Sequence, residues 1–439
     1  MFYSLLEMVR QQKAGASVGI YSCCSANEYV IRAAIQKAKE LGRPVLIEAT
    51  ANQVNQDGGY TGMKPEDFYH FVKRIADEYQ LAEGQLILGG DHLGPLTWVD
   101  LDETEAMRKA EQLVYNYAKA GFTKIHLDTS MRLASDDRNA RLTDDVISRR
   151  GARLCACAEQ GWRERCKEYG DCQAPVYVIG SEVPIPGGAQ EAEDSDSISV
   201  TRADDCMATY RSFQQAFESE GLHDAWSRVI GMVVQPGVEF GDKEVFQYQR
   251  EKAAQLISVL KELPIVFEGH STDYQTAESL RSMVEDGIAI LKVGPALTFA
   301  LREALFALEN IEKELYSGTG LHLSNFRAVL ETAMLKEPKA WEKYFHEDAA
   351  ELRFSRAYSF SDRTRYYLPK AEVNAAVERL MMNLAASDIP LSLISQYMPM
   401  QYRRVRAGLI EHSPLSLVLD RIGDCINTYE YATGAIAWL

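Results

Sequence analysis

The chain has 439 residues, of which 46% are hydrophobic and 25% are charged, an ordinary composition for a folded globular protein. A formal net charge of −16 argues against nucleic acid and against anionic membrane surfaces as partners, because both are bound mainly through Lys and Arg. No run reaches the roughly 18 apolar residues of a membrane span, and the start, MFYSLLEMVRQQKAG, lacks the apolar core of a secretory signal, so we expect a cytoplasmic protein.

Short apolar runs alternate with amphipathic helical stretches through most of the chain. The predicted strands are, in order, Ser17–Tyr21, Pro44–Glu48, Gln85–Leu88, Thr123–Leu127, Pro175–Ile179, Arg228–Val234, Pro264–Phe267 and Ala289–Val293. The predicted helices that follow them are Glu28–Leu41, Glu66–Tyr79, Glu103–Ala120, a long helix from Thr143, Arg202–Glu220, Lys243–Glu262, Gln275–Glu285 and a helix from Ala296 onward. Short strands that are apolar throughout and separated by helices are typical of a parallel sheet buried on both faces.

Eight such units predict a closed (β/α)₈ barrel, the TIM barrel, over residues 1–315. A doubly wound open sheet is the alternative, but no G-x-G-x-x-G follows the first strand, so the dinucleotide fingerprint is missing. From residue 316 the strand pattern fades, and residues 316–439 are expected to form a mainly helical extension packed on the barrel. The helices predicted there are Leu323–Glu337, Pro338–Tyr344, Lys370–Ala385 and Pro390–Met398.

The eight cysteines allow more than one interpretation. Five of them lie between Cys155 and Cys206, and Cys155 and Cys157 form a C-x-C pair, so a zinc knuckle or a disulfide cluster is one interpretation. Without a secretion signal or paired C-x₂-C units, reduced thiols are the better interpretation.

Polar residues follow nearly every predicted strand, at the end where a barrel of this kind places its active site. They are Glu48, Asn52 and Gln53 after the second strand, Asp91 and His92 after the third, Asp128 after the fourth, Glu182 after the fifth, Glu239 after the sixth, Glu268, His270 and Ser271 after the seventh, and Lys292 in the eighth. An Asp or Ser after a strand often only caps a helix, and this alternative is stronger for Asp128, Thr272 and Asp273.

The adjacent Asp91 and His92 are harder to explain as caps. Two ionisable residues directly after the apolar LILGG are costly to desolvate unless they bind something. His92, Glu239 and Glu268 are candidate ligands for Zn²⁺ or another divalent cation, although no two of them form a local metal-binding motif. Ser271 and Lys292 end the seventh and eighth strands, where barrels commonly bind phosphate.

Several long motifs resemble one known family. The segments LIEATANQVNQDGGYTGM, LILGGDHLGP, KIHLDTSM, VIGSEVPIPGG, VFEGHSTDYQ, SDRTRYY and QYMPMQYRRVRAG look like the Z-type subunit of class II tagatose-1,6-bisphosphate aldolase, from about residue 10 to the C-terminus. That family is similar in turn to metal-dependent ketose-bisphosphate aldolases with a (β/α)₈ barrel, and other members resemble enzymes that epimerise carbon 4 of ketohexoses or their 6-phosphates.

The resemblance implies roles for individual residues. Asp91 stands at the place of the aldolase proton-transfer aspartate, His92 at that of a zinc-binding histidine, and Glu182 in the catalytic glutamate loop. Glu268 stands where the aldolases have a second zinc histidine, and Gly269 to Ser271 match their phosphate-binding turn. The third zinc histidine has no counterpart in residues 235–239, so the ligand set departs from that of the aldolases.

The first functional expectation is therefore a metal-dependent enzyme that cleaves and re-forms the bond between carbons 3 and 4 of a ketohexose or its 6-phosphate, as a 4-epimerase or an aldolase. Asp91 and Glu182 would transfer protons, and His92, Glu239 and Glu268 would bind Zn²⁺, with Mn²⁺ or Mg²⁺ as alternatives. The expected substrate-binding residues are Glu48, Asn52, Gln53, Asp128 and His270 for the sugar, and Ser271, Lys292, Arg363 and Arg365 for a phosphate.

The second expectation is a subunit without catalysis of its own. The family includes chains needed for the activity and stability of a partner Y-type aldolase subunit, and the altered metal ligands favour this alternative. An oligomeric assembly is expected under either hypothesis, but the sequence does not locate its interface.

Overall fold

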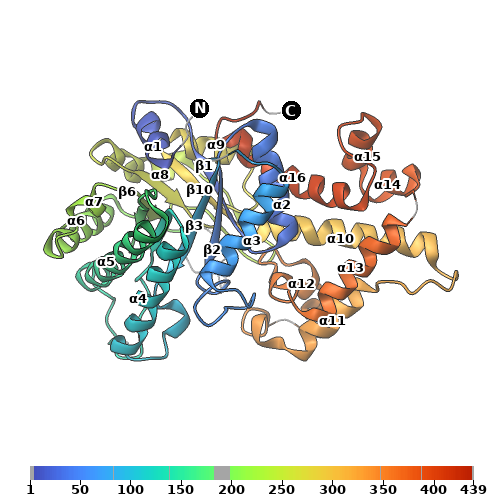
Figure 1. Cartoon of the computed structure of the whole chain (residues 1–439), viewed down its shortest axis with the longest axis horizontal. Helices are drawn as coiled ribbons and strands as arrows, with labels where there is room; N and C mark the ends of the chain where they lie inside the picture. Colours follow the sequence, from blue (N-terminus) through green and yellow to red (C-terminus); the bar gives the residue numbers. More distant parts are fainter. Residues whose placement is uncertain are drawn as a thin grey trace.

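The computed structural model of the protein describes residues 4–82, 84–137, 139–181, 198–346, 348–386 and 388–437. Its eight long strands are β1 Ile20–Cys24, β2 Val45–Thr50, β3 Leu86–Leu93, β4 Lys124–Leu127, β5 Val176–Ile179, β6 Val229–Val234, β9 Val266–Gly269 and β10 Ile288–Val293. They are parallel and close into a barrel in the order β1-β10-β9-β6-β5-β4-β3-β2 (Figure 1). The predicted (β/α)₈ barrel is confirmed, and the open-sheet alternative is wrong.

Two strands differ from their predicted limits in ways that concern function. The first strand begins three residues later than predicted, at Ile20, and includes Cys23 and Cys24. The third strand continues past Leu88 through Leu93, so Asp91 and His92 lie in the strand itself, and Asp91 pairs with Thr50 of β2. Sequence periodicity ends this strand at the two glycines, whereas the ladder with β2 continues to the pair Thr50 and Asp91.

The helices surround the barrel and then extend beyond it. They are α1 Leu5–Lys13, α2 Glu28–Leu41, α3 Pro65–Glu78, α4 Glu103–Ala120, α5 Asp144–Tyr169, α6 Ala203–Ser219, α7 His223–Trp226, α8 Arg250–Ser258, α9 Ala277–Glu285, α10 Pro295–Tyr316, α11 Phe326–Lys336, α12 Ala349–Tyr358, α13 Ala371–Ala385, α14 Leu391–Tyr397, α15 Pro399–Arg406 and α16 Pro414–Ala432. Short 3₁₀ turns are η1 Pro95–Trp98, η2 Val259–Lys261, η3 Pro338–Ala340 and η4 Arg363–Tyr366.

One predicted helix is partly a hairpin. The helix expected over Lys243–Glu262 begins only at Arg250, because β7 Glu239–Phe240 pairs antiparallel with β8 Val245–Phe246. The turn between the two strands contains Gly241, whose N–H donates to the carbonyl of Glu244 at 3.0 Å. Aromatic and β-branched residues flanking a tight turn favour a hairpin over a helix.

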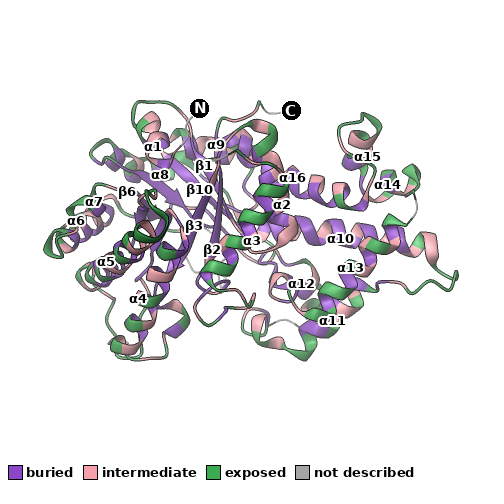
Figure 2. Ribbon diagram, viewed as in Figure 1, coloured by how far each residue is buried: buried purple, intermediate pink, exposed green. Residues whose placement is uncertain are grey.

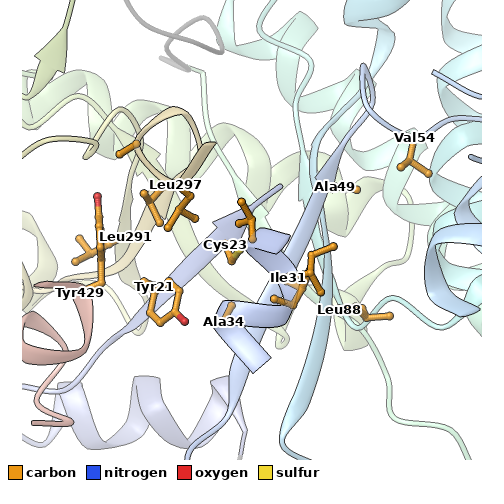
Figure 3. Packing of buried hydrophobic residues seen from close by; sticks show 14 of the residues in the cluster. Tyr21, Cys23, Ile31, Ala34, Ala49, Val54, Leu88, Leu291, Leu297 and Tyr429 are labelled. Atoms are coloured by element: carbon orange, nitrogen blue, oxygen red, sulfur yellow. The ribbon is translucent and has the colours of Figure 1, made fainter. Parts of the chain in front are cut away.

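Two apolar layers hold the barrel together. Inside the barrel, Leu46, Ile87, Val178, Ile230 and other strand residues pack with Leu5, Met8 and Val9 of α1, so this helix closes the N-terminal end. Outside, the opposite faces of the strands pack against the surrounding helices, as for Cys23 and Leu88 beside Ile31 of α2 (Figure 3). This alternation follows from the two-residue period of side chains along a strand.

The C-terminal helices build on α10, which runs from the barrel far into the extension (Figure 1). α11, α13 and α14 pack along α10, whereas α16 returns to pack against α2, α9 and α10. Tyr429 of α16 lies beside Tyr21 of β1, with ring centroids 5.9 Å apart (Figure 3). The outer apolar cluster is continuous from the barrel into the extension, and Figure 2 shows buried faces along α10 and α16.

Two further findings bear on the sequence analysis. Within the described residues, no helix is both long enough and apolar enough to cross a membrane. All eight cysteines are free thiols, so the disulfide-cluster interpretation is wrong.

Candidate active site

A cavity lies at the C-terminal ends of the barrel strands and is lined by residues from five strand ends and from η4 of the extension. Of the predicted site residues, it is lined by Asn52, Gln53, Asp91, His92, His270, Ser271, Lys292 and Arg365. It is also lined by Cys24, Thr50, Tyr60, Asp273 and Tyr366, which the sequence analysis did not single out. The barrel and the extension therefore both contribute to one cavity.

Directly beneath the cavity floor, charged side chains fill the barrel interior. We call Glu48, Asp91, Lys124, Glu268 and Lys292 the buried charge cluster; each is at most 4% exposed. Lys124 Nζ lies 2.7 Å from Glu48 Oε1 and 2.6 Å from Glu268 Oε2. Lys292 Nζ contacts Glu48 Oε2 and lies 2.7 Å from Asp91 Oδ1. Two ammonium groups thus hold three carboxylates from three strands in one buried network.

This pairing keeps the carboxylates ionised. Burial alone would raise the pKa of Glu48, but the charges of Lys124 and Lys292 leave it below its ordinary value. Burial likewise opposes ionisation of Glu268 and Asp91, yet Lys124 and Lys292 hold the pKa of Glu268 well below normal, and His92 and Lys292 do the same for Asp91. The cluster can therefore present full negative charges to a ligand without contact with water.

Three imidazoles converge above the cluster. The ring centroids of His92, His126 and His270 lie 4.9–5.2 Å from one another. Each ring has one nitrogen next to a carboxylate: His92 Nδ1 to Asp128 at 2.8 Å, His126 Nδ1 to Asp91 at 3.0 Å, and His270 Nε2 to Glu268 at 2.9 Å. For His92 and His270, a carboxylate on one ring nitrogen favours a hydrogen there and leaves the other nitrogen with a lone pair for a metal or a proton. His126 differs, because its Nδ1 also accepts the backbone N–H of His92 at 3.2 Å.

The arrangement fits a divalent cation. One ligand atom from each of Asp91, His126, Glu268 and His270 can be chosen so that all four lie within 4.8 Å of one another. His126 Nε2 is buried and has no hydrogen-bond partner among the described residues, so one ring position beside this group is left unsatisfied. With neutral imidazoles, the carboxylates of Glu48, Asp91, Asp128 and Glu268 exceed the two ammonium charges by two, which one divalent cation would balance.

Two local backbone features place these groups. His92 has φ +48°, a left-handed conformation that is uncommon for a residue other than glycine, and the register between β3 and β4 shifts there. Such conformations persist where the surrounding structure enforces them, and they concentrate at functional sites. Gly89 leaves room for the buried carboxylate, because a Cβ at this position would lie 2.3 Å from Glu48 Oε1.

Some predicted site residues do not take part as expected. Glu239 lies on the β7–β8 hairpin, where its Oε1 accepts the N–H of Phe240 at 3.0 Å, and it belongs neither to the four-residue cluster nor to the cavity lining. Arg363 does not line the cavity; its guanidinium stacks 3.4 Å from the ring centre of Tyr344. Lys292 binds carboxylates, and Glu182 lies outside the described residues.

Lys124 and His126 are central to the site, and the sequence analysis did not select them. Both lie in the four-residue strand β4, two positions apart, so their side chains share one face. A polar residue at every second position of an otherwise apolar strand was the available signal. Asp273 follows the seventh predicted strand but was expected only to cap a helix, and Tyr366 reaches the cavity through tertiary packing.

The extension is anchored to the barrel next to the cavity. Asp362 Oδ2 accepts the hydroxyl hydrogen of Thr298 on α10, and the Tyr274 hydroxyl donates to the carbonyl of Phe360 at 2.6 Å. Arg365 then donates to the carbonyl oxygens of Ser361 and Asp362, the latter at 2.8 Å. Its guanidinium lies 4.6 Å from the ring centre of Tyr366, and both side chains line the cavity.

Comparison with known proteins identifies the family of the chain and a closely similar solved structure. The sequence profile of the family described as D-tagatose-1,6-bisphosphate aldolase subunit GatZ/KbaZ-like matches residues 5–434. A crystal structure described as a probable tagatose 6 phosphate kinase from Sinorhizobium meliloti 1021 is 46% identical, with a TM-score of 0.84, and the match covers 94% of this chain and 100% of that one.

Two aldolase structures are much less similar. The YdjI aldolase from Escherichia coli K12 is 12% identical, with a TM-score of 0.41 and coverage of 89% of this chain and 100% of that one. Fructose-bisphosphate aldolase from Campylobacter jejuni is 14% identical, with a TM-score of 0.41 and coverage of 87% and 91%. Similarity at this level carries no conclusion about the site.

Proposed function

The chain belongs to the D-tagatose-1,6-bisphosphate aldolase subunit GatZ/KbaZ-like family, and on that premise we propose that it catalyses aldol chemistry between carbons 3 and 4 of a ketohexose or its 6-phosphate, as a 4-epimerase or an aldolase. The observation that carries the proposal is the convergence of three carboxylate-anchored imidazoles and two buried lysines on the floor of one cavity. Burying so many ionisable groups is costly unless they serve a ligand.

A divalent metal fits this site, and Asp91, His126, Glu268 and His270 would hold it. When bound, it would supply positive charge to the oxygen atoms on carbons 2 and 3 of the ketose. This set retains Glu268 from the sequence analysis and replaces His92 and Glu239 with His126 and His270. It also includes Asp91, which the sequence analysis assigned to proton transfer. His92 remains at the edge of the set, with Nδ1 bound to Asp128.

His92 and Asp128 form the proton-transfer pair in this proposal. Burial would lower the pKa of His92, but Asp91 and the hydrogen-bonded Asp128 raise it above its ordinary value, which makes the imidazole a better base. His92 accepts the proton of the carbon-4 hydroxyl as the bond between carbons 3 and 4 breaks, and the bonding electrons move to the oxygen on carbon 2. Asp128 stabilises the imidazolium, as the carboxylate of a His–Asp pair does.

Lys292 is the second active group. Its ammonium lines the cavity and is fixed by Glu48 and Asp91, so it can stabilise the negative oxygen that forms during cleavage. After the aldehyde has rotated, carbon 3 adds to the other face of carbon 4. His92 then returns the proton to the oxygen on carbon 4, whose configuration is inverted. If the aldehyde is released instead, transfer of the proton from the His92 imidazolium to carbon 3 gives the aldolase products.

The test uses full-length protein purified without chelators. Elemental analysis is expected to find about one divalent ion per chain, and incubation with fructose 6-phosphate is expected to yield tagatose 6-phosphate or triose products. His126→Ala should lose both the ion and the activity, whereas His70→Ala, on an exposed surface of α3, should keep both. A metal-loaded protein that leaves fructose 6-phosphate unchanged would contradict the proposal.

The second candidate is a non-catalytic subunit that stabilises a Y-type aldolase, and the missing class II histidines favour it. Co-expression would then raise the solubility or activity of the partner, and Asp91→Ala and His92→Ala would leave that effect intact. Loss of the effect in these two variants would argue for the catalytic hypothesis instead.

A further inference from the structure

At one end of the cavity, a carboxylate of the chain itself binds the N-terminus of a helix. Asp273, which follows β9, accepts the backbone N–H groups of Gly294 at 3.0 Å and Ala296 at 2.8 Å through the single oxygen Oδ1. Gly294 and Ala296 begin α10, and Pro295 between them has no N–H to offer. Free N–H groups at a helix start after the last barrel strand are where this fold commonly binds phosphate. Here the carboxylate of the chain itself uses those donors.

The negative charge of Asp273 itself also disfavours a second anion in contact with it. Asp273 is 3% exposed and lines the cavity, so a phosphate at this end would lie against a carboxylate. Arg365 is the arginine that lines the cavity in the described residues, and its positive charge already acts on the Asp273 carboxylate. A phosphate placed here could not use the N–H groups of Gly294 and Ala296, which already bind Asp273, and it would be repelled by the Asp273 carboxylate.

A neutral hydroxyl, unlike a phosphate, can bind favourably beside Asp273. A carboxylate accepts hydrogen bonds and cannot donate them, so the favourable neighbour for Asp273 is a hydroxyl that donates. Ser271, which has φ +52° and lines the same cavity, adds a further hydroxyl beside it. This end is therefore suited to one unphosphorylated end of a sugar.

We propose that Asp273 is a specificity-determining residue, which binds a hydroxyl at one end of the ketose and excludes a phosphate there. The ligand is then a free ketohexose or a monophosphate, and a ketose bisphosphate is rejected. This inference rests on the proposed function for the identity of the sugar, but the exclusion of phosphate from the α10 end can be tested without it.

The experiment titrates full-length protein calorimetrically with fructose, fructose 1-phosphate, fructose 6-phosphate and fructose 1,6-bisphosphate at about pH 8, where carboxylates are ionised. The wild type should bind the bisphosphate about tenfold or more weakly than the best of the other three, because like charges in contact repel. Asp273→Asn, which keeps the shape and the acceptor oxygen, and Asp273→Ala should each reduce this discrimination about tenfold. Asp286→Asn, whose carboxylate binds Tyr248 and Arg250 away from the cavity, is the matched control.

A parallel titration with inorganic phosphate separates the two proposals. Phosphate binding that appears in Asp273→Ala and is absent from the wild type supports the exclusion, even if no ketose binds and the proposed function fails. Phosphate binding by both proteins, or by neither, overturns it. Equal affinity of the wild type for mono- and bisphosphate, or an unchanged ratio in Asp273→Asn with a native circular dichroism spectrum, also overturns it.

Discussion

The two halves of the barrel interior lie on the same strands, but one is aliphatic and the other is charged. The half next to α1 contains aliphatic side chains such as Leu46, Ile87 and Val178. Two residues further along β2, Glu48 begins a half in which lysines, carboxylates and imidazoles replace aliphatic groups. Because side chains repeat every two residues, both halves face the barrel axis. The first half can only stabilise the fold, whereas the second half bears a large desolvation cost that a ligand would justify.

A second comparison shows what the lysines do. Glu48 in the barrel and Glu430 on α16 are both at most 4% exposed. Burial would raise the pKa of either carboxyl, but two lysines in contact lower that of Glu48, whereas Arg43 and Lys37 act only weakly on Glu430 and its pKa rises to about 7. Direct ammonium contact therefore decides whether a buried carboxyl stays charged.

The largest effect on stability is expected from Lys124→Met, which removes one of the two ammonium groups from the charged half of the barrel. It would leave Glu48 and Glu268 buried and each short of an ion-pair partner, and removing one partner from a buried pair costs about 3–5 kcal/mol. Urea unfolding followed by circular dichroism measures the loss. Lys73→Met, at an exposed helix position, should stay within about 0.5 kcal/mol of the wild type. Equal stability of the two variants would show that Lys124 does not stabilise the buried carboxylates.

Leu46→Ala tests the apolar half. Truncation of a fully buried leucine should lower the free energy of unfolding by about 2–4 kcal/mol, through lost burial and a residual cavity. The folded variant should keep the metal content and ligand affinity of the wild type, because Leu46 lies in the interior layer that packs with α1. Loss of bound metal without loss of stability would mean that the two halves do not have separate roles.

The smallest effect is expected from Glu430→Gln, which tests the difference between the Glu48 and Glu430 carboxyls. The native pKa of about 7 lies above the ordinary value of 4.5, so the native state binds the extra proton and wild-type stability falls as pH rises from about 4.5 to 7. The glutamine variant lacks this loss. It should be about 3 kcal/mol more stable than the wild type at pH 8 and equally stable near pH 4.5. A constant difference across this range in urea titrations would contradict the assigned pKa.

The sequence by itself determined the barrel. Short apolar runs, each followed by an amphipathic helix, have few ways to bury both faces of a parallel sheet, and the limits of α2 and α4 match their predicted residues. It also indicated the end of the barrel where polar groups gather, because Asp91, His92, Glu268 and Lys292 follow or end the predicted strands. These are local patterns, and local patterns are visible in a sequence.

Only the tertiary structure decided which of those groups meet. Barrel closure sets β10 beside β1 and so brings Lys292 to Glu48, which is 244 residues away in the chain. The hairpin of β7 and β8 separates Glu239 from the four-residue cluster, and packing of the extension carries Arg365 and Tyr366 to the cavity. Charge pairing and cavity lining depend on distances in space, and these follow from register, closure and packing rather than from spacing along the chain.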